Sequence, residues 1–138
     1  EILRCLVGSE MCIRDRVADE KTIEQASVNE INIVKQKEGE RLIKNIKDDA
    51  YVICLAIDGK QLDSVELSNK MDCLALKGKS HICFIIGGSL GLSDEVLKLS
   101  DLKLSFSKMT FPHQLARVLL CEQIYRAFQI NSNGKYHK

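Results

Sequence analysis

The chain has 138 residues, a length typical of one domain, and its formal net charge is only +1. Hydrophobic residues make up 45% of it, which is enough for a sizeable core. A transmembrane helix needs about 20 consecutive apolar residues, and no apolar run in the chain comes close to that length. The lack of a long apolar run excludes a helical membrane protein. The small net charge disfavours a protein that coats nucleic acid through its overall charge. We therefore predict a soluble, cytoplasmic domain.

The charge is nevertheless spread unevenly along the chain. Residues 102–138 contain six basic side chains and a single acidic one, Glu122. A basic C-terminal region in a near-neutral protein favours a local contact with a polyanion such as RNA. The alternative is that these charges merely solvate the exposed faces of helices, and composition alone leaves both interpretations open.

The six cysteines do not form a C-x-x-C pair, so neither a zinc ribbon nor a thioredoxin-type redox site is indicated. Cys54 and Cys83 stand within apolar runs, where a thiol behaves as a small hydrophobic group. We expect reduced, buried cysteines, as is usual in the cytoplasm. No spacing typical of metal ligands or of a serine–histidine–aspartate triad is visible, so we expect no metal.

The first sixteen residues, EILRCLVGSEMCIRDR, show no clear helical or strand period and do not begin with Met. They resemble the translated read-through of a cloning or sequencing adapter. We therefore predict that residues 1–16 are a non-native segment and that residues 17–138 form the domain. A divergent native start and a targeting segment are the alternatives, although the absence of a long apolar stretch argues against a signal peptide.

The first half of the domain reads as helix, strand, helix. Apolar residues at three- and four-residue steps predict a helix over 27–46, which Gly39 weakens in its middle. A β-prone run over 51–57 predicts a strand buried on both faces, and Asp58-Gly59 predicts the turn that ends it. A second helix is expected over 63–76, with Gly78 as its stop.

The second half repeats the alternation. We expect a buried strand over 81–86, a short helix capped by Ser93, and a third strand over 102–106. Pro112 stands near the first turn of a final helix, where its missing N–H is tolerated. The apolar sector of that helix is wide, which suggests a dimer face. Residues 131–134 are expected to be flexible, and Tyr136-His137-Lys138 is expected to be a loose terminus.

Strands alternating with helices predict an α/β fold with a mainly parallel sheet, whose ligands bind beyond the carboxyl ends of the strands. Here those ends are Asp58-Gly59, Gly87-Gly88 and Ser107-Lys108. The glycine-rich loop of residues 87–91 lets the backbone approach a ligand, but it is neither a P-loop nor G-x-G-x-x-G. His113, at the start of the last helix, could act as a base, although a structural role is the more common one.

Several strings in order then match a known family. They are Lys37-Glu38-Gly39-Glu40-Arg41-Leu42, Ile57-Asp58-Gly59-Lys60, the run from Phe84 to Ser89, the run from Leu104 to Gln114, the run from Glu122 to Ala127, and the terminal Tyr136-His137-Lys138. From Val17 to Lys138 the chain resembles the bacterial ribosomal RNA large subunit methyltransferase H family of the SPOUT methyltransferases.

The resemblance implies an α/β SPOUT fold with a C-terminal trefoil knot, a homodimer, and S-adenosylmethionine as methyl donor. True knots are rare, and nothing in the composition indicates one. By matching position, the cofactor contacts would be Leu55, Gly87, Phe106, Ser107, Lys108, Met109, Thr110 and Phe111.

The reaction implied by the resemblance is methylation of N3 of a pseudouridine in helix 69 of 23S rRNA, on the assembled 70S ribosome. Since the base N3–H must lose its proton, a nearby base or polarising group is needed, and Tyr136 and His137 are the candidates. Arg117, Arg126 and Lys138 are candidates for contacts with RNA phosphates, and Glu122 for orienting its partners.

The chain departs from the family at its start, where the family has a strand, a helix and a second strand before the position of Val17. Losing strands from the sheet would expose apolar surface worth about 25 cal/mol per Å², so we expect this chain to be unstable or to aggregate. Two other functions remain open: a non-catalytic RNA-binding or dimerisation module that retains the cofactor fold, and a nucleotide-cofactor oxidoreductase. The second is disfavoured because no dinucleotide fingerprint follows the first strand.

Overall fold

The computed structural model describes residues 2–7, 15–17, 27–87 and 90–138. A five-stranded sheet in the order β2-β1-β4-β3-β5 forms its centre. Strands β3 (Tyr51–Gln61), β4 (Ile82–Ile86) and β5 (Leu102–Ser105) are parallel, with β3 in the middle of the three. The predicted α/β fold with a mainly parallel sheet is therefore confirmed, and the trefoil knot stays a prediction.

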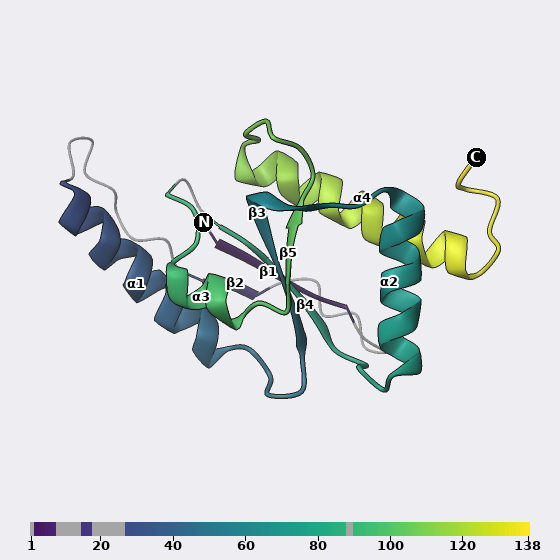
Figure 1. Cartoon of the computed structure of the whole chain (residues 1–138), viewed down its shortest axis with the longest axis horizontal. Coiled ribbons are helices and arrows are strands. Elements are labelled where there is room, and N and C mark those ends of the chain that lie inside the picture. Colours follow the sequence, from purple (N-terminus) through teal and green to yellow (C-terminus); the bar gives the residue numbers. More distant parts are fainter. Residues whose placement is uncertain (1, 8–14, 18–26, 88–89) are drawn as a thin grey trace.

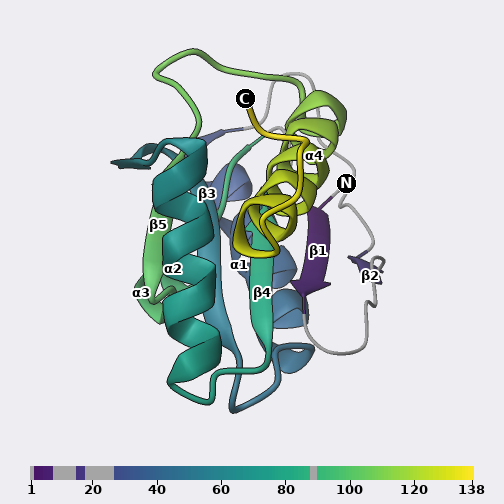
Figure 2. The ribbon, with the colours of Figure 1, turned by 90° about the vertical axis from the view of Figure 1, so that its right-hand side faces the viewer.

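Helices cover both faces of this sheet. Helices α1 (Val28–Lys44) and α3 (Asp94–Leu99) lie on one face, and α2 (Ser64–Leu76) and α4 (His113–Asn131) lie on the other (Figure 1). Figure 2 shows α2 and α4 in front of the strands and α1 behind them. The protein is thus a three-layer α/β/α arrangement.

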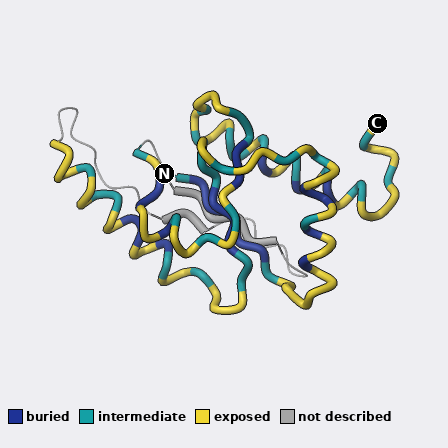
Figure 3. The backbone as a smooth tube through the Cα atoms, viewed as in Figure 1, coloured by how far each residue is buried: buried dark blue, intermediate teal, exposed yellow. Residues whose placement is uncertain are grey.

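The alternation of side chains along the central strands divides the core in two. Ile53 and Phe84 face α2 and α4, in a cluster that includes Met71, Leu120 and Ala127. Their strand neighbours Cys54, Cys83 and Ile85 face α1 and α3, against Leu42 and Val96. All five residues of β4 are buried, and the strands form the dark centre of Figure 3. Burial on both faces explains why the strand sequences are continuously apolar.

Local signals set the ends of the helices close to where the sequence predicts them. Ser27 and Asp63 cap α1 and α2 through capping boxes with Glu30 and Glu66, respectively. After α2, Gly78 takes a positive φ of 76°, and the amide of Lys79 donates to Leu74 O at 3.0 Å. This Schellman geometry confirms Gly78 as the stop of the helix.

The predicted turn at Asp58-Gly59 is wrong, because β3 continues through these residues to Gln61. The pairing of β3 with β5 instead shifts between Leu55 and Lys60, both of which lie opposite Leu104. The extra residues form a bulge, which bends a strand without ending it. A Cβ on Gly59 would lie 2.7 Å from the carbonyl carbon of Lys103, so only glycine lets the backbones of β3 and β5 approach this closely.

The N-terminal segment also differs from the expectation that it forms no regular element. Residues Ile2–Val7 form β1, which pairs antiparallel with β4, and Asp15–Val17 form β2, which pairs antiparallel with β1. Strand β1 occupies the side of β4 away from β3, so β4 is not an edge strand. Residues 1 and 8–14 lie outside the described part of the chain, and the non-native origin of residues 1–16 stays a prediction.

The C-terminal tail makes hydrogen bonds that the sequence does not predict. Helix α4 includes Asn131, whose side-chain amide donates to Ser68 O at 3.0 Å. Beyond the helix, the amide of Gly134 donates to Gln129 O at 2.7 Å. These bonds close the last turn of the helix, and the flexibility of residues 131–134 stays a prediction. Among the described residues, no helix is long and apolar enough to cross a membrane.

Candidate active site

An open cavity of about 840 Å³ lies where the three parallel strands end and α4 begins. This volume is within the range of about 300–1,000 Å³ that is usual for small-molecule sites. Its lining comes from residues 55–58 of β3, the exit of β4, residues 90–92, Leu97 of α3, the end of β5 with the loop after it, and the first turn of α4. The cavity thus occupies the predicted binding edge of the sheet.

Apolar side chains form most of the cavity wall, and a few polar groups stand among them. Leu55, Phe106 and Phe111 contribute hydrophobic surface, while Ser107 and Thr110 contribute hydroxyl groups. Met109 also lines the cavity, although its side chain is 64% exposed. A largely apolar wall with a few polar groups suits an amphipathic ligand that carries an aromatic ring.

Glycines bring the backbone close together at the exit of β4. A Cβ added to Gly87 would lie 3.0 Å from the carbonyl carbon of Gly91 and 3.1 Å from Leu92 N. Gly91 itself has a positive φ of 79°, a conformation that glycine adopts without strain. Gly88, the other glycine of the predicted binding edge here, lies outside the described residues. Gly87 therefore allows the close backbone approach at this exit, whereas a Cβ on Gly91 would meet nothing within 4 Å.

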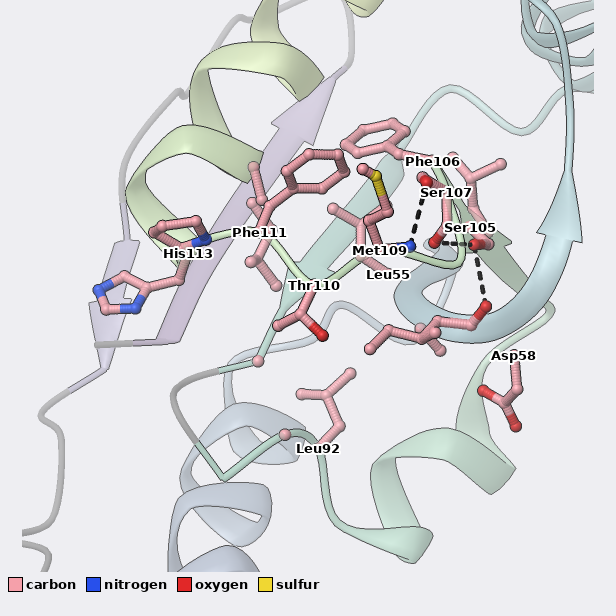
Figure 4. A pocket seen from close by; sticks show the side chains of 18 of the residues that line it. Leu55, Asp58, Leu92, Ser105, Phe106, Ser107, Met109, Thr110, Phe111 and His113 are labelled. Atoms are coloured by element: carbon pink, nitrogen blue, oxygen red, sulfur yellow. Dashed lines mark hydrogen bonds between the residues drawn. The ribbon is translucent and has the colours of Figure 1, made fainter.

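Hydrogen bonds of two serines hold the loop after β5. The hydroxyl oxygen of Ser107 accepts from the Met109 amide at 3.1 Å, which forms a tight local turn. The hydroxyl oxygen of Ser105 lies 3.0 Å from Ile57 O and 3.0 Å from Ser107 O. These contacts join the loop to β3, as the dashed lines in Figure 4 show.

The structure brings most of the predicted cofactor residues together around this cavity. Its lining includes Leu55, Gly87, Phe106, Ser107, Met109, Thr110 and Phe111. Lys108 is exposed and is not part of the lining. Ser105 and His113 are among the lining residues that were not predicted to be site residues, and for His113 a structural role was favoured. The only sequence signal for Ser105 is a hydroxyl at the end of an apolar strand.

A second group of predicted site residues surrounds the C-terminal half of α4. The guanidinium of Arg126 donates to Glu122 through Nε at 3.0 Å, and its carbon lies 4.8 Å from the centre of the Tyr136 ring. The Tyr136 hydroxyl donates to Glu122 at 3.2 Å, and Arg126 lies 3.3 Å from His137 Nδ1. We call Glu122, Arg126, Tyr136 and His137 the tail cluster. It corrects the expectation of a loose terminus.

The charges of the tail cluster stabilise one another. The hydrogen bond from Arg126 is the main cause that lowers the pKa of Glu122 below its usual value, and the bond to Glu122 in turn raises the pKa of Arg126. Tyr125 completes the packing with an edge-to-face contact to Tyr136, at 5.0 Å between ring centres. The tail is therefore held against α4 by charge-assisted and aromatic contacts.

The tail cluster and the cavity lie at different ends of α4. The helix rises about 1.5 Å per residue, so Arg126 stands about 20 Å along the axis from His113 at the cavity. Neither Tyr136 nor His137 lines the cavity, and the same is true of the predicted RNA contacts Arg117, Arg126 and Lys138. The structure therefore does not bring the predicted catalytic residues to the predicted cofactor residues within one chain.

The described residues show no metal site, and the buried thiol of Cys54 is not in its reactive form. No group of three or more metal-binding side chains occurs among them. Burial raises the pKa of Cys54 to about 12, and its thiol lies 3.8 Å from Val96 O. A thiol with so high a pKa stays protonated and behaves as part of the apolar core, as the sequence predicts.

Three parallel strands that end at a partly apolar, glycine-bordered cavity are typical of α/β proteins that bind small molecules at this edge of the sheet. Comparison with known proteins narrows this class, because a family model described as "Predicted SPOUT methyltransferase" matches residues 9–137. The chain is 59% identical over 120 residues to "Ribosomal RNA large subunit methyltransferase H" of Clostridioides difficile (strain 630), covering 87% of this chain and 76% of that relative.

Two further relatives carry the same name. The one from Bifidobacterium adolescentis is 62% identical over 122 residues, and the one from Exiguobacterium sp. is 58% identical over 122 residues. Each alignment covers 88% of this chain and 77% of the relative. The chain therefore belongs to the SPOUT methyltransferases, and within them to the ribosomal RNA large subunit methyltransferase H family. It is an enzyme of the methyltransferase class, and the predicted resemblance is confirmed.

Proposed function

We propose that this protein methylates ribosomal RNA, with S-adenosylmethionine as the methyl donor. We further propose N3 of a pseudouridine in helix 69 of 23S rRNA as the target, in the assembled 70S ribosome of the cytoplasm. The names of the relatives support ribosomal RNA as the substrate. The observation that carries the proposal is the cavity at the carboxyl edge of the sheet, which gathers seven of the eight predicted cofactor residues.

The residues of the cavity fit S-adenosylmethionine in size and chemistry. The donor combines an aromatic adenine with a polar ribose and amino acid, and the lining combines Phe106 and Phe111 with the hydroxyls of Ser107 and Thr110. Asp58, the acidic residue of the lining, gives the cavity a negative group for a cationic ligand. When bound, the donor supplies a methyl group activated by its sulfonium sulfur.

The chain's own contribution at this cavity is to bind, orient and exclude water. The close approach of Gly87 to Gly91 leaves backbone polar groups of the loops near the cavity. These groups can form hydrogen bonds with a ligand directly, without help from long side chains. Leu55 and Phe106 provide apolar surface that a bound donor would cover, which would reduce its contact with water. Fixed positioning of this kind lowers the barrier to group transfer without a metal.

The proton on N3 of the base must be removed before or as the new carbon–nitrogen bond forms. Tyr136 and His137 stay our candidates for this role or for positioning the base, although neither lines the cavity of its own chain. We therefore propose that they serve the cavity of a second copy of the chain. Arg117, Arg126 and Lys138 stay proposed contacts with RNA phosphates, with Arg126 oriented by Glu122.

The outer face of α4 supports the proposed homodimer. Leu115, Val118, Tyr125 and Phe128 recur at helical spacing, and their side chains are between 45% and 62% exposed. A row of large apolar side chains at this exposure is typical of a surface that another protein covers. We expect Val118→Glu to convert the dimer to a monomer, as measured by light scattering after gel filtration. Glu40→Gln, an exposed change on α1, is the matched control. A wild-type monomer would contradict the proposed dimer.

Two measurements test the function. Calorimetric titration with S-adenosylmethionine should show binding, and labelled donor should transfer its methyl group to 70S ribosomes from cells that lack this activity. Mass spectrometry of the digested 23S rRNA should then place the methyl group on a pseudouridine of helix 69. Binding to ribosomes without methyl transfer would instead favour the non-catalytic RNA-binding module. Absence of donor binding would overturn the proposal.

A further inference from the structure

Ser105 is the last residue of β5 and lies beneath the wall of the cavity. Its side chain is almost fully buried, with 3% of the residue exposed. Its hydroxyl lies at 3.0 Å from two carbonyl oxygens, those of Ile57 and Ser107 (Figure 4). A hydroxyl has one proton, which it donates to either carbonyl or shares between them. Because the site is buried, the interaction is protected from competing water.

The first of these carbonyls belongs to the irregular part of β3. The ladder between β3 and β5 shifts between Leu55 and Lys60, and Ile57 lies inside that interval. A bulge interrupts the regular ladder of backbone hydrogen bonds. The Ser105 hydroxyl supplies a donor to Ile57 O at this interruption, and so it fixes the bulge that carries Ile57 and Asp58 into the cavity wall.

The second carbonyl belongs to the loop after β5, which forms another part of the cavity wall. Ser107 O lies within hydrogen-bond distance of Ser105, and the Ser107 hydroxyl oxygen accepts from the Met109 amide. When the single Ser105 proton is shared between the two carbonyl oxygens, a continuous set of hydrogen bonds runs from the β3 bulge through Ser105 to residues 107–109. Both parts of the wall contain predicted cofactor residues, on β3 at Leu55 and on the loop from Phe106 onward.

We propose that Ser105 is a positioning residue for the methyl donor: its hydroxyl holds the β3 bulge and the 106–111 loop at the separation that binds the donor. The proposal rests on the proposed function, because it takes the cavity as the donor site. Alanine at this position would fill almost the same volume but leave two carbonyl groups without the hydroxyl. Serine is thus required for the shape of the site more than for the packing of the core.

The test compares Ser105→Ala with Ser105→Thr, which retains the hydroxyl, and with Ser68→Ala as a matched control. Ser68 is fully buried, and its hydroxyl donates to Val65 O at 2.8 Å within α2, away from the cavity lining. All variants and the wild type are titrated with S-adenosylmethionine and with S-adenosylhomocysteine. Thermal unfolding and amide hydrogen exchange are followed without ligand, and KM for the donor is measured separately from kcat.

We expect Ser105→Ala to weaken binding of both ligands about tenfold, the change that follows from losing one or two buried hydrogen bonds. The KM for the donor should rise more than kcat falls, and exchange should become faster in residues 56–58 and 106–111. Ser105→Thr, which retains the hydroxyl, should bind both ligands with an affinity close to that of the wild type. The control should lower the melting temperature by a similar amount, while leaving ligand affinity unchanged.

Two results separate the inference from the proposed function. If the wild type binds the donor and Ser105→Ala binds it equally well, with unchanged exchange in the loop, the positioning role is wrong and the function stands. If Ser68→Ala loses as much affinity as Ser105→Ala, the effect is general destabilisation, and the positioning role is again wrong. A wild type that binds no donor overturns the proposed function and this inference with it.

Discussion

The cavity and the tail cluster lie at opposite ends of α4 and are built in different ways. Backbone approaches shape the cavity, with Gly59 against β5 and Gly87 against Gly91. The tail cluster depends on long side chains, mainly the ion pair of Arg126 with Glu122 and the ring of Tyr136 over Arg126. Tight backbone contacts tolerate almost no change, whereas partly exposed charged contacts can be exchanged at low cost. The cavity should therefore be the rigid part of the enzyme and the tail cluster the adaptable part.

Gly59→Ala should produce the largest effect. The added Cβ would lie within 2.8 Å of backbone atoms of Lys103 and Leu104, and backbone cannot move aside as a flexible side chain can. We expect a loss of about 3 kcal/mol in the free energy of unfolding, measured by urea denaturation, together with loss of donor binding.

Gly78→Ala is the matched control for this change. Gly78 has a positive φ of 76° but nothing within 4 Å of an added Cβ, so its substitution tests conformational strain alone. It should cost about 1–2 kcal/mol and leave donor binding intact. Equal stability of Gly59→Ala and the wild type would show that the close approach of β3 to β5 is not a constraint.

Gly39→Ala should produce an intermediate effect, although it places a better helix former inside α1. An added Cβ would collide with the Ser93 hydroxyl and lie 3.3 Å from Val96 Cγ2. The gain in helix propensity is about 1 kcal/mol, and overpacking costs about 1–3 kcal/mol. We expect a net loss of stability in chemical denaturation.

The origin of that loss can be checked by combining Gly39→Ala with Ser93→Ala. Removing the hydroxyl relieves the collision, at the expense of the cap bond from Val96 N to Ser93 at 3.4 Å. The two substitutions together should therefore cost less than the sum of their separate effects. If the two effects on the free energy of unfolding are strictly additive, the stability lost in Gly39→Ala does not come from the collision with Ser93.

Glu122→Gln should have the smallest effect on stability, and that effect should depend on pH. The pKa of Glu122 is lowered in the folded state, mainly by the hydrogen bond from Arg126. Its carboxylate therefore stabilises the fold fully above its usual value of 4.5, and this contribution is lost as the pH falls through the lower folded-state pKa.

Melting temperatures of Glu122→Gln and the wild type should thus differ slightly at pH 7 and converge as the pH falls through the lowered pKa of Glu122, below 4.5. Glu40→Gln, a substitution at an exposed carboxylate on α1, provides the baseline for changes caused by net charge. A difference between the two Gln variants that grows on acidification would contradict the assigned role of the ion pair.

The order of helices and parallel strands between residues 27 and 131 could be predicted from the sequence, because it depends on local signals. Continuous apolar runs marked β3 and β4, and Ser27, Asp63 and Gly78 marked the ends of helices. The binding edge followed from the rule for parallel sheets, and the family followed from strings such as the run from Leu104 to Gln114. Each of these signals is contained in a short stretch of chain.

What the sequence could not predict depends on contacts between distant segments. The continuation of β3 through Asp58-Gly59 is decided by the shifted pairing with β5, and the role of Ser105 by carbonyl groups on two separate segments. The docking of Tyr136 and His137 beside Arg126, away from the cavity of the same chain, is likewise a property of the folded tail. Local propensities therefore determined the elements of this protein. Only the tertiary structure decided the bulge, the cavity and the separation of the two predicted groups of site residues, because each depends on the distance between atoms far apart in the sequence.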